Sequence, residues 1–228
     1  MFRGKKYKKI AESFDRNQAY DLKAAIEILK KSELKFDQTV EIHFNLGVDP
    51  KHSDQVVRGT VVLPHGTGRQ VRVLVFCKDN NLEAAKNAGA DYAGGDDLVQ
   101  KIQSGWLEFD AVVATPDMMP VISKVAKVLG PRGLMPSPKA GTVTINVAQT
   151  VKELKAGKIQ YRVDKGANVH APVGKLSFSE EQLIENIKAV IESVVKAKPQ
   201  TSKGTYIKSM SLAATMTPGI KLDLGLTR

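Results

Sequence analysis

The residues that most often bind transition metals are scattered in this chain of 228 residues. His43, His52, His65 and Cys77 do not have the spacing of metal ligands, so we predict no metal site. The chain also lacks the glycine signatures of nucleotide binding. No Gly-x-Gly-x-x-Gly follows the apolar run at residues 71–76, and no Gly-x-x-x-x-Gly-Lys-Ser/Thr is present. We therefore expect no bound cofactor.

Two carboxylates and one further histidine remain as candidates for catalysis. Asp110 and Asp117 flank an apolar run at residues 111–114, at a strand end where open α/β sheets bind ligands. This position supplies no mechanism by itself, and capping or solvation explains both aspartates. His170 is isolated in a segment that we interpret as a loop. An enzyme acting on a phosphorylated metabolite near Thr115 and Asp117 is one alternative, but we predict that the chain is not an enzyme.

A second set of side chains has the chemistry of nucleic-acid binding. Phe36 beside Lys35 combines a ring that can stack on a base with a cation, although a core phenylalanine is an equal alternative. Thr215, Met216 and Thr217 can offer hydroxyls and an apolar cap to a ribose surface, or they form an ordinary turn. Candidate phosphate contacts, each also explicable as a plain surface lysine, are Lys165, Lys175, Lys198 and Lys203.

The overall charge favours a polyanionic partner. The net charge is +10 and the isoelectric point is about 9.6. Basic residues gather around Tyr7, at residues 3–9, and form either a poorly ordered tail or an arm that contacts phosphates. The chain shows no apolar run of about 18 residues and no signal-peptide pattern. With the single Cys77, this predicts a cytoplasmic protein with no membrane segment. Nucleic acid is the leading partner class, and a basic scaffold for acidic proteins is the alternative.

The element expected to position these side chains is a strand at residues 35–46. Apolar residues stand at every second position from Phe36 to Leu46, interrupted only by Gln38, as in a half-buried strand. Similar strands are expected at residues 59–63, 159–163, 206–212 and 220–224. One helix is expected after a cap at Asp21 and another after a capping box of Ser179 with Gln182.

The middle of the chain has a different pattern. The runs at residues 71–76 and 111–114 are almost continuously apolar, as in buried parallel strands. They alternate with predicted helices through residues 82–86, 98–102, 121–128 and 147–156. This alternation predicts a three-layer α/β domain with helices on both faces of a parallel sheet.

The two patterns predict a split α+β domain, formed by both chain ends, with an α/β domain inserted into it. We place the split domain at residues 1–66 plus 159–228 and the inserted domain at residues 67–158. The inserted domain holds 12 Lys and Arg against 9 Asp and Glu, and the split domain holds 22 against 15. The net charges are therefore +3 and +7, so the main polyanion surface is expected on the split domain.

Four motifs resemble the ribosomal protein L-one family, and the similarity runs nearly from end to end. They are residues 35–41 (KFDQTVE), 59–66 (GTVVLPHG), 130–142 (GPRGLMPSPKAGT) and 170–175 (HAPVGK). The resemblance implies the same split domain with a Rossmann-like insertion and a hinge. With only two chain crossings between the domains, we assign the hinge to Pro64, Gly66 and Gly157.

The resemblance also implies partners and site residues. Family members bind large-subunit (23S) ribosomal RNA through the split domain, form a mobile stalk beside the tRNA exit site, and assist the release of deacylated tRNA. In bacteria they commonly repress their own messenger RNA by binding its leader. We expect a monomer within the ribosome. The predicted RNA-binding residues are Lys35, Phe36, Thr39, Glu41, Lys165, His170, Lys175, Thr215, Met216 and Thr217.

Thr217 departs from the family pattern, which usually has glycine after the Thr-Met pair. Two explanations are open. Either the backbone at this position tolerates a side chain, or the approach of the RNA is remodelled.

Overall fold

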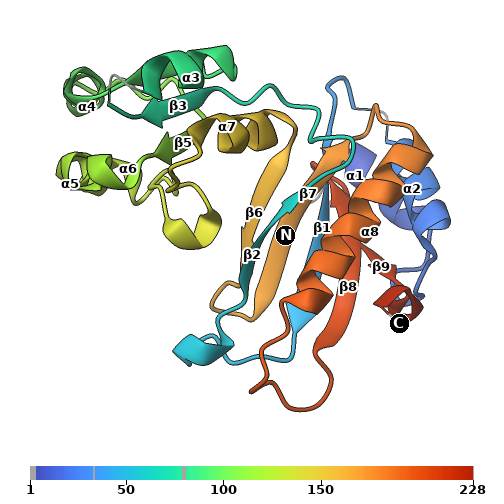
Figure 1. Cartoon of the computed structure of the whole chain (residues 1–228). Coiled ribbons are helices and arrows are strands. Elements are labelled where there is room, and N and C mark those ends of the chain that lie inside the picture. Colours follow the sequence, from blue (N-terminus) through green and yellow to red (C-terminus); the bar gives the residue numbers. More distant parts are fainter. Residues whose placement is uncertain (1–3, 33, 79–80, 228) are drawn as a thin grey trace. The chain divides into compact units, whose positions relative to one another are not determined.

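The computed structural model describes residues 4–32, 34–78 and 81–227 of a mixed α/β protein (Figure 1). It divides into two compact units. Unit 1 comprises Met1–Gly68 and Ile159–Arg228, and unit 2 comprises Arg69–Lys158. The division therefore falls two residues beyond Gly66, so that this predicted hinge residue lies inside unit 1.

Unit 1 is built on a four-stranded antiparallel sheet of order β7-β1-β8-β9. A two-stranded sheet, β2 with β6, completes its β-structure. The strands are β1 (Thr39–Leu46), β2 (Arg58–Val62), β6 (Lys158–Arg162), β7 (Asn168–Lys175), β8 (Ile207–Ala214) and β9 (Ile220–Leu222).

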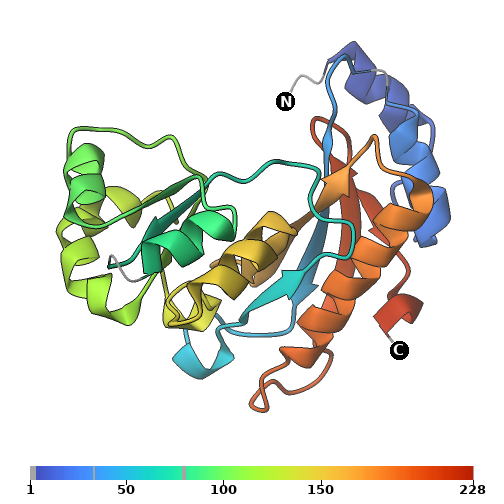
Figure 2. The same cartoon turned by 45° about the horizontal axis from the view of Figure 1, so that its top comes forward.

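Helices α2 (Leu22–Lys30) and α8 (Glu180–Lys196) pack against the sheet and against each other (Figure 2). The predicted capping box is confirmed, because the Ser179 hydroxyl accepts the Gln182 N–H and the Gln182 side chain accepts the Ser179 N–H. Asp21 occupies the N-cap of α2 as predicted, but its side chain makes no capping hydrogen bond. We interpreted the basic run at residues 3–9 as a tail or an arm. Residue 3 lies outside the described residues, and residues 5–9 belong to helix α1 (Lys5–Glu12).

The predicted strand at residues 35–46 begins four residues later than expected. β1 starts at Thr39, and its burial then alternates strictly with Val40, Ile42, Phe44 and Leu46 in the core. The alternation fails before that point: Gln38 is buried, whereas 48% of Phe36 is exposed. The core alternative for Phe36 is therefore wrong.

The segment before β1 is held by side-chain contacts instead of a strand ladder. The N–H and hydroxyl of Ser177 donate to the Asp37 carboxylate at 3.1 and 2.8 Å, and the Leu176 N–H donates to the Gln38 carbonyl at 2.9 Å. The rule that alternate residues face the core holds only within a strand, so it fails for residues 36 and 38, which precede β1.

The segment around His170, which we interpreted as a loop, is strand β7. Proline and glycine, here Pro172 and Gly174, are uncommon inside strands, but β7 is an edge strand of its sheet, where proline is tolerated. Its ladder with β1 is irregular at the same point, because Val40 pairs with Gly174 and Glu41 with Pro172. Val173 is thus the extra residue of a β-bulge.

Unit 2 contains the predicted parallel sheet, of order β4-β3-β5. Its core residues form two clusters, one on each face, so that β3 is buried along its whole length. The strands are β3 (Val73–Phe76), β4 (Tyr92–Gly94) and β5 (Ala111–Ala114), and the helices include α3 (Leu82–Asn87), α4 (Asp96–Gln103) and α7 (Val147–Lys155).

The predicted helix through residues 121–128 is broken into short pieces. They are α5 (Met119–Ile122), the 3-10 turn η4 (Ser123–Val125) and α6 (Ala126–Leu129). The buried residues are Ile122, Val125 and Leu129, whereas Val121 and Val128 are half-buried. Further 3-10 turns are η1 (Ser53–Gln55), η3 (Pro116–Met118), η5 (Pro138–Ala140) and η6 (Leu224–Thr227).

Candidate nucleic-acid interface

The four-stranded sheet presents one face of polar side chains, partly or fully exposed, opposite its core. On β1 this face carries the residues that alternate with Val40, Ile42 and Phe44. Strand pairing brings residues of β7 and β8 beside them. We call this surface the polar sheet face and define it as Thr39, Glu41, His43, Asn45, Asn168, His170, Pro172, Lys175, Ser209, Ser211, Ala213 and Lys221.

Lys175 reaches this face because of the bulge at Val173. His170 and Pro172 face the polar side, and a regular strand would put Gly174 there and turn Lys175 toward the core. The extra residue shifts the parity, so that Lys175 pairs with Thr39 across the ladder. The Lys175 ammonium donates to the Thr39 hydroxyl at 2.9 Å.

Thr215 joins the same cluster from the end of β8. Its N–H donates to the Thr39 carbonyl at 3.0 Å, and its hydroxyl accepts the Thr39 N–H at 3.2 Å. Three predicted RNA-binding residues from distant parts of the chain, Thr39, Lys175 and Thr215, are therefore brought together at one end of the sheet.

Met216 lies next to this cluster in a strained conformation. Thr217 N–H donates to the Ala214 carbonyl at 2.9 Å, closing a β-turn in which Met216 is the third residue. Met216 has φ of +66°, in the left-handed region that favours glycine, and 70% of it is exposed. Strain of this kind concentrates at functional sites.

The geometry at Thr217 supports the first explanation for its departure from the family pattern, a backbone that tolerates a side chain. The residue with positive φ is Met216, and Thr217 is not among the positive-φ residues of the described chain. The Thr217 hydroxyl accepts the Ala214 N–H at 2.9 Å. The backbone therefore accommodates a side chain here, and the hydroxyl of this side chain adds a hydrogen bond to the turn that the Thr217 N–H closes.

A pair of histidines lies in the middle of the polar sheet face. The Nδ1 atoms of His43 and His170 are 2.8 Å apart, and His170 Nε2 is 3.7 Å from the Asp164 carboxylate. Burial lowers the pKa of His43, the charge of His170 lowers it further, and Glu41 partly opposes the shift. The Asn168 N–H, at 2.7 Å, is the main cause that lowers the pKa of Asp164.

The remaining predicted residues lie at the two ends of this surface. Phe36 and Lys35 are exposed just before β1, and Phe36 lines a shallow groove with Leu176 and Phe178. Lys165 is exposed in the turn that precedes β7, at the far end of the sheet, where Asn168 pairs with Asn45. The predicted residues therefore form an extended surface with one dense cluster at Thr39.

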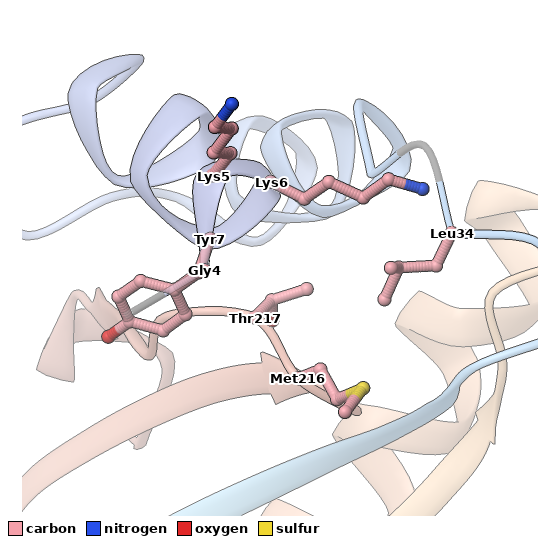
Figure 3. Close-up of a pocket in the computed structure, with 7 residues that line it drawn as sticks. All are labelled: Gly4, Lys5, Lys6, Tyr7, Leu34, Met216 and Thr217. Atoms are coloured by element: carbon pink, nitrogen blue, oxygen red, sulfur yellow. The ribbon is translucent and has the colours of Figure 1, made fainter. Parts of the chain in front are cut away.

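The N-terminal helix adds residues that the sequence did not assign to the site. Gly4, Lys5, Lys6 and Tyr7 line a pocket together with Leu34, Met216 and Thr217 (Figure 3). The basic run at residues 3–9 was the available signal, but nothing local in the sequence indicated that it packs beside the turn after β8.

The predicted hinge residues have different structural settings. Gly66 is held to α8, because the buried Asn186 donates to its carbonyl at 3.0 Å and accepts the His65 N–H at 3.1 Å. Gly157 follows the end of α7 with φ of +104°. Pro64 is exposed.

Asp110 and Asp117 do not form a catalytic pair. Asp110 precedes β5 and binds the guanidinium groups of Arg69 and Arg72, whose hydrogen bond and charge lower its pKa. Asp117 follows the opposite end of β5 and lies 3.9 Å from the Lys78 ammonium. The strand separates the two carboxylates.

The described residues contain neither a metal-binding cluster nor a membrane-spanning helix. Across residues 4–32, 34–78 and 81–227, no three His, Cys, Asp or Glu side chains gather as they would around a metal ion. None of the helices in these ranges is long and apolar enough to cross a membrane.

Together these features define a class: a mixed α/β protein whose split unit presents a polar sheet face of mixed charge. The model of the Ribosomal protein L1p/L10e family matches residues 27–218. The chain is also 56% identical over 220 residues to "Large ribosomal subunit protein uL1" of Chlorobium phaeobacteroides (strain DSM 266 / SMG 266 / 2430), covering 96% of each chain.

The chain belongs to the ribosomal protein L1 family. The resemblance inferred from the four motifs is thereby confirmed, and so is the predicted location at the ribosome in the cytoplasm. Membership of a ribosomal family also supports the prediction that the chain is not an enzyme.

Proposed function

We propose that the chain is a structural protein of the large ribosomal subunit that binds 23S ribosomal RNA through the polar sheet face. The observation that carries the proposal is the cluster of Thr39, Lys175 and Thr215, with the strained and exposed Met216 beside it. The Thr215 hydroxyl accepts the Thr39 N–H and the Thr39 hydroxyl accepts from the Lys175 ammonium, so both hydroxyls are held in place before RNA binds.

The arrangement suits recognition of RNA by shape. The deep major groove of A-form RNA hides its bases, so proteins contact riboses, phosphates and splayed bases. A sheet face holds its side chains at fixed spacings, and hydroxyls of threonine can donate to or accept from a ribose 2′-OH. Lys175 and Lys35 add attraction to phosphates, and Phe36 offers an exposed ring at the boundary of the surface.

The test is binding of the full chain to a stalk fragment of 23S ribosomal RNA, titrated against salt with an unrelated RNA hairpin as competitor. We expect binding that survives moderate salt and excess competitor. Equal, salt-labile binding to both RNAs would show only attraction of the net charge of +10 to any polyanion.

Two lysines provide a matched pair for this titration. Lys175→Met removes a charge from the polar sheet face and should reduce the salt slope by roughly 0.7 to 0.9 log units per lost phosphate contact. Lys155→Met removes the same charge from unit 2, where Lys155 pairs with Asp91 at 2.7 Å, and should leave the slope unchanged. Equal slopes in both variants would remove Lys175 from the interface.

Release of tRNA from the exit site and repression of the chain's own messenger RNA are finer parts of this proposal. The repression follows if the messenger leader presents the same RNA shape. The leader should then compete with the 23S fragment for one site and lose affinity in Lys175→Met in parallel. Independent binding of the two RNAs would contradict it.

We also propose a hinge between the two units, because the chain passes between them only twice and so few connections allow relative motion. Single-pair fluorescence between labels in unit 1 and unit 2 should then report more than one distance. A single distance, with and without RNA, would contradict the hinge.

A further inference from the structure

A pocket of about 460 Å³ lies beside the turn that carries Met216 (Figure 3). Its volume is within the range of about 300–1,000 Å³ that is typical of small-ligand sites. Helix α1 forms one wall, the residue before the β1 entry segment forms another, and the turn after β8 forms a third. The lining residues are Gly4, Lys5, Lys6, Tyr7, Leu34, Met216 and Thr217.

The chemistry of this lining combines apolar walls with a basic rim. Leu34, Met216 and the ring of Tyr7 can contact a flat apolar object on several sides. Figure 3 shows the Lys6 side chain extending from α1 toward Leu34, across the hollow from Met216. Lys5 and Lys6 place positive charge where anionic groups attached to a bound ring would pass.

Arg16 fixes one of these walls. Its guanidinium donates to the Tyr7 hydroxyl at 3.1 Å and lies 5.5 Å from the centre of the Tyr7 ring. The Tyr7 ring is therefore braced, so a base that packs against it costs little further loss of conformational freedom.

The pocket is continuous with the proposed RNA surface. Met216 and Thr217 line it, while Thr215, the preceding residue, is bonded to Thr39 on the polar sheet face. Leu34 also lines the groove that contains Phe36. RNA bound on the polar sheet face would thus pass its backbone along the edge of the pocket.

We propose that this pocket receives one unpaired base that the bound RNA turns out of its stack, held between Tyr7, Leu34 and Met216. A base is flat, largely apolar on its faces and attached to phosphates, which matches apolar walls with a lysine rim. This role also gives a reason for the left-handed Met216, since its position directs a flexible thioether toward the cavity. The inference rests on the proposed function.

The test is a set of 23S stalk fragments in which each unpaired position is made abasic in turn. With the unaltered chain, removal of one particular base should weaken binding about 5- to 150-fold, the range expected for one stacked base. In Tyr7→Ala, removal of the same base should change affinity less than about threefold. Leu34→Trp, which fills the pocket instead of emptying it, should give the same loss of sensitivity.

Two control variants separate the pocket from its surroundings. Lys8→Ala removes a charge from the exposed side of the same helix and lies outside the lining, so it should keep the full abasic penalty. Phe36→Ala should keep it as well, because Phe36 lies outside the pocket. Circular dichroism melts confirm that each variant is folded.

The outcomes distinguish this inference from the proposed function. If the unaltered chain binds the stalk RNA specifically but no abasic position is coupled to Tyr7 or Leu34, the pocket role is wrong and RNA binding stands. A penalty that disappears in Phe36→Ala and persists in Tyr7→Ala would also overturn it. If the unaltered chain does not prefer stalk RNA, the proposed function fails and the inference fails with it.

Discussion

The two units treat their central sheets in opposite ways. In unit 2, Val73, Leu74, Val75 and Phe76 are all buried, because core clusters cover both faces of the parallel sheet. In unit 1, β1 buries only alternate residues. A sheet buried on both faces has no exposed face to offer a partner, whereas a sheet with one polar face presents an ordered surface.

The charges follow the same division. Arg69, Arg72, Lys78, Lys124, Lys155 and Lys158 of unit 2 each lie within 4.0 Å of a carboxylate of that unit. Unit 1 has the larger positive surplus. It also contains ion pairs, such as Lys30 with Glu180, but its Lys175 donates to the Thr39 hydroxyl, and the part of the chain that the structure describes shows no carboxylate within 4.0 Å of it. The difference supports the proposal that RNA binds to unit 1, which also contains the predicted site residues.

The largest expected effect is on the free energy of unfolding, and it compares the sheet with one buried face with the sheet that is buried on both faces. In unit 1, Phe44→Ala should lower the free energy of unfolding by about 3–5 kcal/mol, whereas Glu41→Ala should change it by less than about 0.5 kcal/mol. In unit 2 there should be no such alternation: Val75→Ala and Phe76→Ala, at consecutive positions, should cost about 2 and about 3–5 kcal/mol.

Urea denaturation of the four variants measures these differences. A large loss in Glu41→Ala would mean that the polar sheet face is a structural surface, and the contrast between the units would disappear.

The next largest effect is a change in RNA affinity that leaves the stability of the protein nearly unchanged. Phe36 is about half exposed beside β1, so Phe36→Ala should leave the free energy of unfolding nearly unchanged. If the ring stacks on the RNA, the same change should weaken binding to the stalk fragment by about 1–3 kcal/mol. Unchanged affinity in a folded variant would restrict the RNA surface to the cluster around Thr39.

Replacing Met216 with glycine should raise the stability of the protein and lower its affinity for RNA. Met216→Gly removes the cost of a left-handed side-chain residue and should raise the free energy of unfolding by up to about 1 kcal/mol. It also removes an exposed apolar side chain beside Thr215, so affinity for the stalk RNA should fall. Denaturation and binding assays on the same sample check both signs; a variant that is less stable would show that Met216 is not strained.

The elements of this fold were predictable where a single local signal decides them. The capping box at Ser179, the buried run at Val73–Phe76 and the alternation from Val40 to Leu46 each depend on neighbouring residues. Strand β7 was missed because Pro172 and Gly174 indicate a loop locally, and only the ladder with β1 shows the edge strand and its bulge.

The candidate site was predictable as a set of residues, mainly through the family motifs, but not as an arrangement. The sequence could not show that a bulge turns Lys175 toward Thr39, since the bulge is visible only in the pairing of β7 with β1. It also could not show that the left-handed residue is Met216 and not Thr217. The packing of Tyr7 near Met216 joins segments about two hundred residues apart in sequence.

The smallest expected effect is a pH dependence confined to the polar sheet face. Burial and the neighbouring His170 lower the pKa of His43 below its ordinary value of about 6.5, so the folded state disfavours its protonation. The unfolded chain then binds the proton more readily, and stability falls as the pH drops below about 6.5 toward the lowered value. His43→Gln should flatten this part of the profile.

RNA should reverse the sign of that dependence. Phosphates brought near His43 favour its charged form and raise its pKa, so binding takes up a proton and affinity rises between about pH 8 and about pH 6. Glu41 already acts on His43 in the same direction, which limits the size of the change. Stability and affinity measured across this range should therefore move in opposite directions in the unaltered chain and lose that opposition in His43→Gln. Parallel changes would place the RNA away from the middle of the sheet and leave only its Thr39 end as the interface.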